Sequence, residues 1–534
     1  MSFEALLLLL TAVAVVSGIT RRLGFPAPFA LVLAGLVIGV VPGTPTVELD
    51  PDVVLVLILP PLLYAAALST AFAEFRSSLR PIGLLSIGLV LVTTVTVGAV
   101  AHAVLPSLPL AAALALGAIV APTDAVAATA VGRRMALPSR ILTILEGESL
   151  LNDATALVSY RIAVAAAVAG TATWLTAGRD FVVAAVGGAV VGFVLGWAVA
   201  ALRRRLDDPL LENALSLLTP FAAYLPAEAI GASGVLSVVV VGLYIGRRSP
   251  VLLSSSTRLQ SQALWSMITF LLEGLVFLLI GLQLPGVVNG LSTHEQGEVA
   301  LLSAAVTLTV VLIRFLWVFP ATYLPRRLSR RLRERDPAPP WQVPVLIGWA
   351  GMRGVVSLAA AFALPTDMPG RDLILFVTFV VIITTLLLQG MTLAWVVRRL
   401  GLDDVGVADR VERAVAVADH HVARTALAEL ERIAEVERLV GTVADELRGH
   451  LEERVRRAHA VLGGCPGEHE YDDGVDLTGG DAIAEASSAT EVRLRLLEAE
   501  RAELVRLYAD RVIDDEVLRR VQRQLDVEEL ALVR

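Results

Sequence analysis

Two acidic residues in apolar sequence, Asp124 and Asp153, have side chains that could bind a cation or a proton. Asp124 follows Pro122 and Thr123 in the run AIVAPTDAVAATAV, and Asp153 lies in the next run, ILTILEGESLLNDATALV. An ionised carboxylate at membrane depth is costly, so such residues are rare there and usually functional. The alternative, that these acids belong to a soluble core or a loop, conflicts with the hydrophobicity of the flanking residues. We therefore predict a cation site here.

A helix through the second run would arrange further oxygen atoms around this site. At helical spacing, Glu146, Ser149 and Asp153 share one face, while Glu148 and Asn152 share a neighbouring face. Hard cations prefer oxygen ligands. The spacing thus predicts two oxygen-bearing stripes on one helix.

Membrane-spanning helices must position these residues. The chain has 534 residues, is 56% hydrophobic and has a mean hydropathy of +0.71. About thirteen apolar runs in residues 1–400 are each long enough to cross a bilayer. We read the first run as a retained helix rather than a signal peptide. The sequence predicts an all-α membrane protein with helices near residues 4–20, 25–42, 53–70, 81–105, 108–131, 141–169, 180–202, 211–226, 232–247, 262–284, 299–322, 342–364 and 372–398.

The distribution of basic residues among the loops predicts the orientation of the chain in the membrane. Arginines occur after the first, third, fifth, seventh, ninth and eleventh runs, whereas the alternate loops hold only Arg179 and Arg371. Cytoplasmic loops carry the excess of basic residues. The N-terminus is therefore expected outside and the C-terminus in the cytoplasm.

Two of the predicted helices contain helix-breaking residues at corresponding places. The fifth has Pro122 before Thr123 and Asp124, and the twelfth contains GWAGMRG, with Gly351, Arg353 and Gly354. Thirteen helices allow two six-helix halves in an inverted repeat around a linking helix. Paired interruptions of this kind indicate a transporter site near the bilayer midplane.

The composition changes after residue 400. Residues 401–534 contain 31 acidic residues and 18 arginines, and therefore carry a net charge of about −13. Helical spacing resumes on either side of a Gly- and Asp-rich linker at 463–481, which contains Cys465, the only cysteine. We expect residues 1–400 to form the membrane domain and residues 401–534 a helical cytosolic tail for regulation or dimer contacts. Nothing in the sequence suggests an enzyme, a cofactor or a nucleic-acid partner.

Four phrases resemble a known family. APTDAVA, EGESLLNDATALV, GMRGVVSLA and the tail phrase IDDEVLRRVQRQLD are similar to monovalent cation:proton antiporters, in the bacterial sodium/proton exchanger branch that includes the animal exchangers. The resemblance covers the whole membrane region. It implies a homodimer in which the two broken helices cross as unwound segments beside the helix that carries Asp153.

The resemblance also implies roles for individual residues. Asp153 would bind either the cation or the proton, and Asp124, the Thr123 carbonyl and Ser149 would complete or support the site for transported Na⁺. Asn152 would take the place of a second Asp in the electrogenic branch. Glu148 and Arg353 would form a buried ion pair. Further intramembrane charges are a possible accessory set: Glu146, Glu273 and Arg161, the last two of which either line the ion path or form structural ion pairs.

One position departs from the family. Some members have a Glu on the third helix after LPPLL(F/Y), where this chain has Ala65. One oxygen ligand of the cation is therefore missing or replaced. The preference of the site for Na⁺ or K⁺ is thus left open by this position.

These observations predict an antiporter that exchanges Na⁺ or Li⁺ for H⁺ across the bacterial plasma membrane and contributes to pH homeostasis. A single titrating acid beside the neutral Asn152 predicts electroneutral exchange. K⁺/H⁺ exchange is the alternative. A channel, or a receptor with a signalling tail, fits less well, because a channel needs no proton-competing acid and a receptor would need an output domain.

Overall fold

The computed structural model describes most of the chain: residues 3–23, 27–41, 53–135, 137–169, 174–206, 208–289, 296–402, 405–437, 441–463 and 482–533. Cys465 and most of the predicted linker lie outside the described residues. Within the described part, every regular element is a helix, as the all-α prediction requires.

Two compact units make up the chain. The first contains residues 1–249 and 262–404, and the second contains residues 250–261 and 405–534. The division after residue 404 comes close to the boundary expected at residue 400. Residues 250–261, which were predicted as part of an arginine-bearing loop between two helices of the domain 1–400, group with the C-terminal residues instead.

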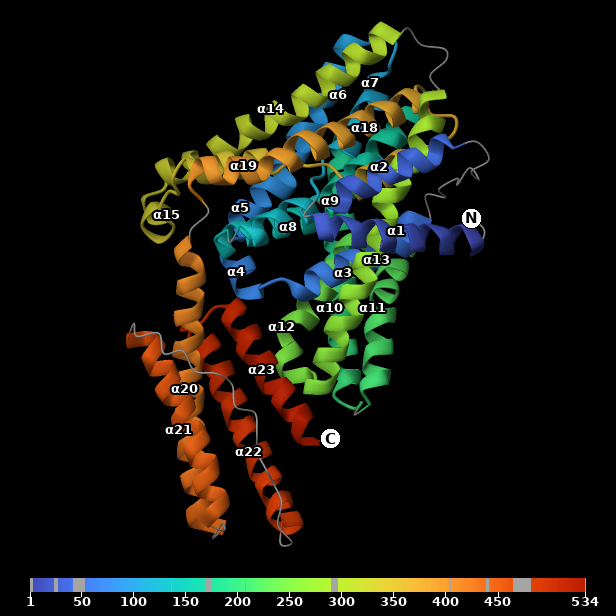
Figure 1. The fold of residues 1–534 in the computed structure, drawn as a ribbon. Coiled ribbons are helices and arrows are strands. Elements are labelled where there is room, and N and C mark those ends of the chain that lie inside the picture. The colour runs from blue at the N-terminus through green and yellow to red at the C-terminus, as the bar shows by residue number, and fades with distance from the viewer. Residues whose placement is uncertain are drawn as a thin grey trace. The chain divides into compact units, whose positions relative to one another are not determined.

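The first unit begins with helices that alternate with shorter turns (Figure 1). Its first twelve elements are α1 (Phe3–Leu23), α2 (Ala27–Val40), the π-helical η1 (Val53–Ile58), α3 (Leu59–Ser69), α4 (Phe72–Ser77), α5 (Leu79–Gly83), the π-helical η2 (Leu84–Leu89), α6 (Val90–Val104), α7 (Leu110–Val120), α8 (Val126–Arg134), α9 (Ser139–Ala169) and α10 (Trp174–Arg203).

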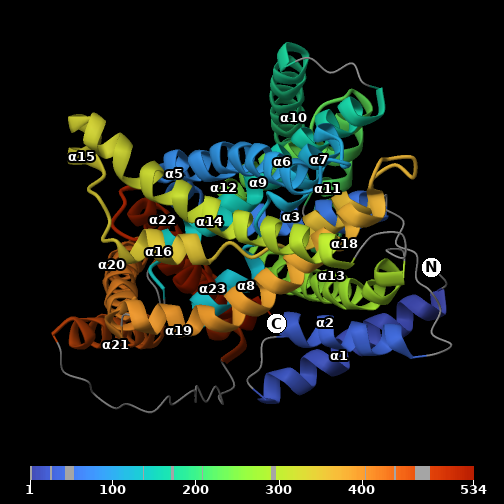
Figure 2. The same cartoon turned by 90° about the horizontal axis from the view of Figure 1, so that it is seen from above.

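The remaining elements of this unit are helices as well. They are α11 (Pro209–Ala229), α12 (Gly234–Leu252), α13 (Ser255–Asn289, whose first residues belong to the second unit), α14 (Gln296–Leu328), α15 (Arg330–Arg335), α16 (Gln342–Trp349), α17 (Val355–Phe362), α18 (Arg371–Thr385), the π-helical η3 (Leu386–Gly390) and α19 (Met391–Leu400). Both views show α1 beside α2 and α6 beside α14 (Figure 2).

Six helical stretches among the described residues are long and apolar enough to cross a membrane. They are Leu6–Leu23, Leu79–Val104, Gly178–Arg203, Ser255–Gly286, Gln296–Leu328 and Arg371–Leu400. Shorter apolar helices cover Ala27–Val40, Leu55–Ser69 and Leu110–Val120. The described residues thus form a multi-pass helical membrane protein.

Both predicted interruptions are present, and local chemistry explains each. α7 ends at Val120, two residues before Pro122, because proline lacks an N–H donor and its ring clashes with the preceding turn. α16 ends at Trp349 and α17 begins at Val355, with Gly351 and Gly354 between them. Glycine is a poor helix former, so the chain can remain unwound there.

The second unit contains four tail helices. These are α20 (Val405–Glu437), α21 (Gly441–Gly463), α22 (Ala482–Ala509) and α23 (Asp515–Val533), and α20 packs against the other three. Asp514 accepts a hydrogen bond from the Val517 amide (2.9 Å) and so caps the start of α23. The apolar faces of three helices form one core that includes Ala418, Val422, Leu497, Leu504, Leu507, Val517, Leu518, Val521 and Leu525.

Candidate functional site

The two unwound segments meet directly. The backbone amide of Asp124, in the first break, donates to the carbonyl of Met352 in the second (2.8 Å). A Cβ atom at Gly354 would overlap the Asp124 carboxylate, so this approach requires glycine. The contact brings together residues separated by more than two hundred positions in the chain, as the paired interruptions predict.

Asp124 lies at the start of the half-helix that follows the first break. One of its carboxylate oxygens accepts from the Val126 amide at the first residue of α8 (2.8 Å). The positive end of the α8 dipole favours this negative charge. The Ala125 amide donates to the Ser149 hydroxyl (3.4 Å), so Ser149 lies against the same break. Asp124 and Ser149 are therefore neighbours of one unwound segment.

Asp153 lies on α9 in a different environment. Its side chain is buried, and within the described part of the chain it has neither a hydrogen bond nor an ion pair. Its chain neighbour Asn152 donates to the carbonyl of Thr123, the chain neighbour of Asp124, so both acids lie at the junction of α9 with the first break. A buried acid without a partner is costly as a bare anion. It needs either a proton or a cation.

Asn152 and Thr123 join α9 to the first break. The Asn152 amide donates to the Thr123 carbonyl (3.0 Å) and to its hydroxyl (2.9 Å), and that hydroxyl donates to Glu148 (2.8 Å). The other polar atom of Asn152, Oδ1, is buried without a hydrogen-bond partner among the described residues. It is thus a further candidate oxygen ligand.

The partner of Glu148 differs from the prediction. Glu148 pairs with Arg314 of α14, not with Arg353: two guanidinium nitrogens of Arg314 bind its two carboxylate oxygens, one at 2.9 Å. The Arg314 Nε also donates to the Ile347 carbonyl of α16 (3.0 Å). Both ion-pair partners are almost fully buried, at 1% and 2% side-chain exposure. This pair joins α9, α14 and α16.

Arg353 has a different role in the structure. Its guanidinium donates to the Ala121 carbonyl at the end of α7, and its backbone amide donates to Thr385 of α18 (3.1 Å). A cation at a helix C-terminus is favoured by the helix dipole. Spacing alone could not choose between Arg314 and Arg353, because the choice depends on how distant helices are rotated toward one another.

Among the described residues, the other predicted residues make no hydrogen bond or ion pair with this network. Glu146 forms an ion pair with the exposed Arg133 (2.8 Å), and Arg161 pairs with Glu228 of α11 (2.5 Å). Glu273 has no hydrogen bond or ion pair in the part of the chain that the structure describes. Ala65 is buried in α3 and supplies no side-chain oxygen.

The sequence has similar proteins over most of its length. It matches the family described as "Sodium/hydrogen exchanger, transmembrane" over residues 7–399. It is 38% identical over 537 aligned positions to an uncharacterized Na(+)/H(+) exchanger of Mycobacterium tuberculosis, covering 98% of this chain and 95% of that protein. It is also 36% identical over 408 positions to a sodium, potassium, lithium and rubidium/H(+) antiporter of Bacillus subtilis, covering 73% of this chain and 61% of that protein.

Solved structures of antiporters are similar in fold. The sodium proton antiporter MjNhaP1 from Methanocaldococcus jannaschii matches with a TM-score of 0.56 at 20% identity, covering 74% of this chain and 97% of that one. At this identity the likeness concerns the fold alone.

Proposed function

The chain belongs to the sodium/hydrogen exchanger family, and we propose that it exchanges Na⁺ or Li⁺ for H⁺ across the bacterial plasma membrane, one cation for each proton. Antiport of monovalent cations against protons follows from the family, and the chain is a transporter, not an enzyme. The observation that carries the specific proposal is the buried Asp153, without a hydrogen bond or ion pair among the described residues, on the helix that Asn152 joins to the first of two contacting helix breaks.

Exchange requires a group that holds a proton or a cation but not both. Asp153 suits this task, because a bare carboxylate without a partner is penalised at this depth, whereas the protonated and the cation-bound forms are not. The two loaded forms carry the same charge. Both can therefore cross the dry barrier, and the empty anion cannot.

α9 and the first break both supply oxygen atoms for the cation. We assign the carboxylates of Asp153 and Asp124, the Ser149 hydroxyl, the Thr123 carbonyl and Oδ1 of Asn152 as its candidate ligands. The Thr123 carbonyl accepts from Asn152 but keeps a second lone pair. Hard monovalent cations favour such a set of oxygens.

One-for-one exchange follows from the charge at this site. Asn152 is neutral, so only one proton is exchanged at Asp153 for each cation. In proteoliposomes with a clamped pH gradient, the Na⁺/H⁺ exchange rate should not respond to an imposed membrane potential. A clear voltage dependence would contradict electroneutral exchange.

K⁺/H⁺ exchange is the second candidate. Two observations favour it: Ala65 supplies no oxygen where some family members have a Glu, and the relative from Bacillus subtilis is named for potassium as well as sodium. Proton flux driven by Na⁺, Li⁺ or K⁺ in everted vesicles distinguishes the candidates. The proposal expects Na⁺ and Li⁺ to drive the larger flux, and a larger K⁺ response would overturn it.

The architecture that goes with this function is also part of the proposal. The membrane unit has thirteen spans in an inverted repeat, with the N-terminus outside and the tail in the cytoplasm. Alternating arginine-bearing loops support this orientation. The active form is a homodimer, as in the family that the sequence resembles.

A further inference from the structure

Three arginines from different helices of the membrane unit converge on one carboxylate. Asp336, after α15, binds Arg140 in the first turn of α9 (2.7 Å) and Arg326 in the last turn of α14 (2.7 Å). Arg80 of α5 approaches the same carboxylate at 4.0 Å. We call Arg80, Arg140 and Arg326 the arginine cluster. With Asp336 it holds three positive charges and one negative charge, so an excess of two positive charges remains.

Other acids close to the cluster in the chain have partners of their own. Glu334 in α15 pairs with Arg330 (3.0 Å), and Glu74 accepts from the Thr143 hydroxyl (2.7 Å). Two nitrogens of Arg80, Nε and Nη1, are buried and have no hydrogen-bond partner among the described residues. Buried donors without an acceptor are costly. The cluster thus has both charge and donors for one more anionic acceptor.

The cluster lies where membrane-spanning stretches end. Arg80 is the second residue of the stretch Leu79–Val104, and Arg326 lies in the last turn of the stretch Gln296–Leu328. Because both arginines approach Asp336, these two ends lie at the same membrane surface. The phosphate groups of a bilayer lie at this level, just outside the hydrocarbon core.

Exposed apolar side chains flank the arginines. Leu79 is next to one arginine of the cluster, and Leu324 and Leu328 lie two residues before and after another; all three are exposed. Trp341, immediately before α16, is exposed as well. Tryptophan is enriched at membrane–water interfaces. The acyl chains of a phospholipid would cover this surface, whereas a soluble anion would leave it exposed to water.

We propose that the arginine cluster binds the phosphate group of a membrane phospholipid, with Arg80 and Arg140 as its main donors. Arginine recognises phosphate through paired N–H groups, and basic pockets between membrane helices bind lipid headgroups. Arg140 is 52% exposed and therefore open to a lipid. Arg326 instead donates to the backbone carbonyls of Asp336 (3.1 Å) and Thr322, so it holds the segment that carries the carboxylate.

The inference goes beyond antiport, and it depends neither on the transported cation nor on the orientation of the chain. The excess positive charge of the cluster favours an anionic lipid over a zwitterionic one. The bound phosphate would neutralise part of the repulsion between the arginines. It would thereby stabilise the ends of α5, α9 and α14 at the membrane surface.

Lipid binding to the full-length protein in detergent tests the proposal, by native mass spectrometry with dioleoyl phosphatidylglycerol as the probe. The double variant Arg80→Gln/Arg140→Gln should bind this lipid about tenfold more weakly or worse. The matched control is Arg327→Gln/Arg331→Gln, which removes the same charge from exposed positions at the same end of α14 and in α15. Unchanged affinity in the cluster variant, or an equal loss in the control, would overturn the proposal.

A gain of binding provides a test that misfolding cannot imitate. Asp336 competes with the phosphate for the arginines, so Asp336→Asn should bind phosphatidylglycerol about fivefold more tightly. Weaker binding by a folded Asp336→Asn protein would contradict a phosphate site here.

A soluble competitor distinguishes the two sources of phosphate. Glycerol 3-phosphate at the same concentration should not displace phosphatidylglycerol from the wild type, and dioleoyl phosphatidylcholine should bind more weakly than phosphatidylglycerol. Displacement by glycerol 3-phosphate would assign the cluster to a soluble phosphate and overturn the lipid proposal. Equal binding of the two lipids would show that the excess charge does not select the headgroup, and would overturn it as well.

Discussion

Asn152 donates its side-chain amide to the backbone carbonyl of Thr123 across the first helix break (3.0 Å). The same amide donates to the Thr123 hydroxyl, and this hydroxyl donates to Glu148. Glu148 in turn accepts from Arg314. A chain of side chains therefore holds the unwound segment in place. The Thr123 carbonyl, which the break leaves without a helical hydrogen bond, therefore keeps a defined direction.

Removing the Asn152 amide should weaken cation binding. Asn152→Ala removes the candidate ligand Oδ1 and the donor that orients the Thr123 carbonyl, so the apparent Na⁺ affinity should fall. The unsatisfied buried acceptors should also cost about 1–3 kcal/mol of stability. The matched control is Thr155→Val, because the Thr155 hydroxyl bonds only to Leu151 of its own helix. Unchanged Na⁺ affinity in the Asn152 variant, measured by cation-dependent proton flux, would show that the bridge does not shape the site.

The buried ion pair should matter more for stability than for selectivity. Arg314→Met leaves Glu148 charged without its partner, which typically costs about 3–5 kcal/mol. Arg133→Met breaks the exposed pair with Glu146, at 67% and 25% side-chain exposure, and should cost about 1 kcal/mol or less.

Thermal unfolding in detergent measures both effects. Adding Glu148→Gln to Arg314→Met should recover part of the lost stability, since no uncompensated charge remains. Equal, small losses for the Arg314 and Arg133 variants would contradict the buried pair.

The sequence was sufficient to predict the two helix breaks and the acids that lie near them. Pro122 and Gly354 mark the two breaks, and Asp124 and Asp153 are acids in apolar runs. These are local properties, because a helix breaker acts on its own helix and a charge is unfavourable in lipid wherever it lies. Their positions could therefore be predicted without knowledge of the tertiary structure.

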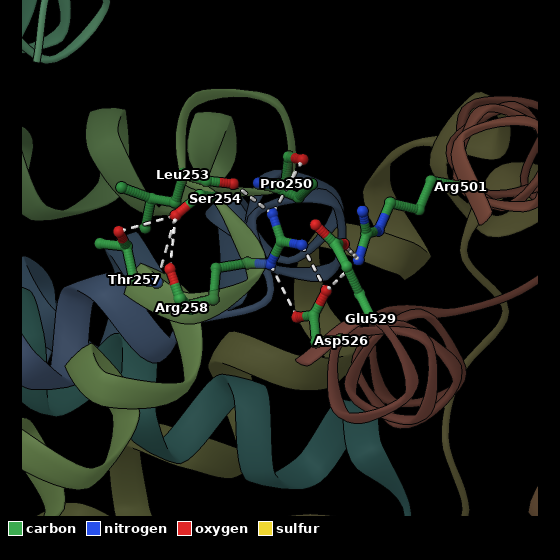
Figure 3. A network of polar contacts seen from close by, with 9 residues as sticks. Pro250, Leu253, Ser254, Thr257, Arg258, Arg501, Asp526 and Glu529 are labelled. Atoms are coloured by element: carbon green, nitrogen blue, oxygen red, sulfur yellow. Dashed lines mark hydrogen bonds and ion pairs between the residues drawn. The ribbon is translucent and has the colours of Figure 1, made fainter. Parts of the chain in front are cut away.

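Pairings between distant elements could not be predicted in this way. Glu148 had two arginines within apolar helices as possible partners, and only the packing of α9 against α14 and α16 selects Arg314. The ion pair between Arg258 and Asp526 (Figure 3) is a second case, since these residues are 268 positions apart in the chain. Neither residue differs in its local sequence from an ordinary surface charge.

The carboxylate of Asp336 and its arginine partners give a prediction about how stability depends on pH. Asp336, after α15, binds Arg140 (2.7 Å) and Arg326 (2.7 Å). Burial alone would raise the pKa of Asp336. The hydrogen bond and charge of Arg140, with the charges of Arg326 and Arg80, outweigh burial and lower the pKa below its usual value of 3.8.

The sign of the pH effect follows from this lowered pKa. Because the folded protein favours ionised Asp336, its contribution to stability is present above the ordinary pKa and is lost as the pH falls through the lowered value. Asp336→Asn should therefore reduce the melting temperature at neutral pH, and the difference from wild type should shrink below about pH 4. A difference that grows on acidification would contradict this sign.

The most direct test of the account concerns Asp153. Asp153→Asn keeps the shape of the side chain but cannot alternate between a proton and a cation. Na⁺-driven proton flux should be measured in proteoliposomes for wild type, Asp153→Asn and the control Glu146→Gln, each checked for monodisperse behaviour in detergent. The account predicts flux in wild type and in the Glu146 variant, and none above the protein-free background in Asp153→Asn. Appreciable Na⁺-driven flux in a folded Asp153→Asn protein would contradict the claim that this carboxylate carries either ion.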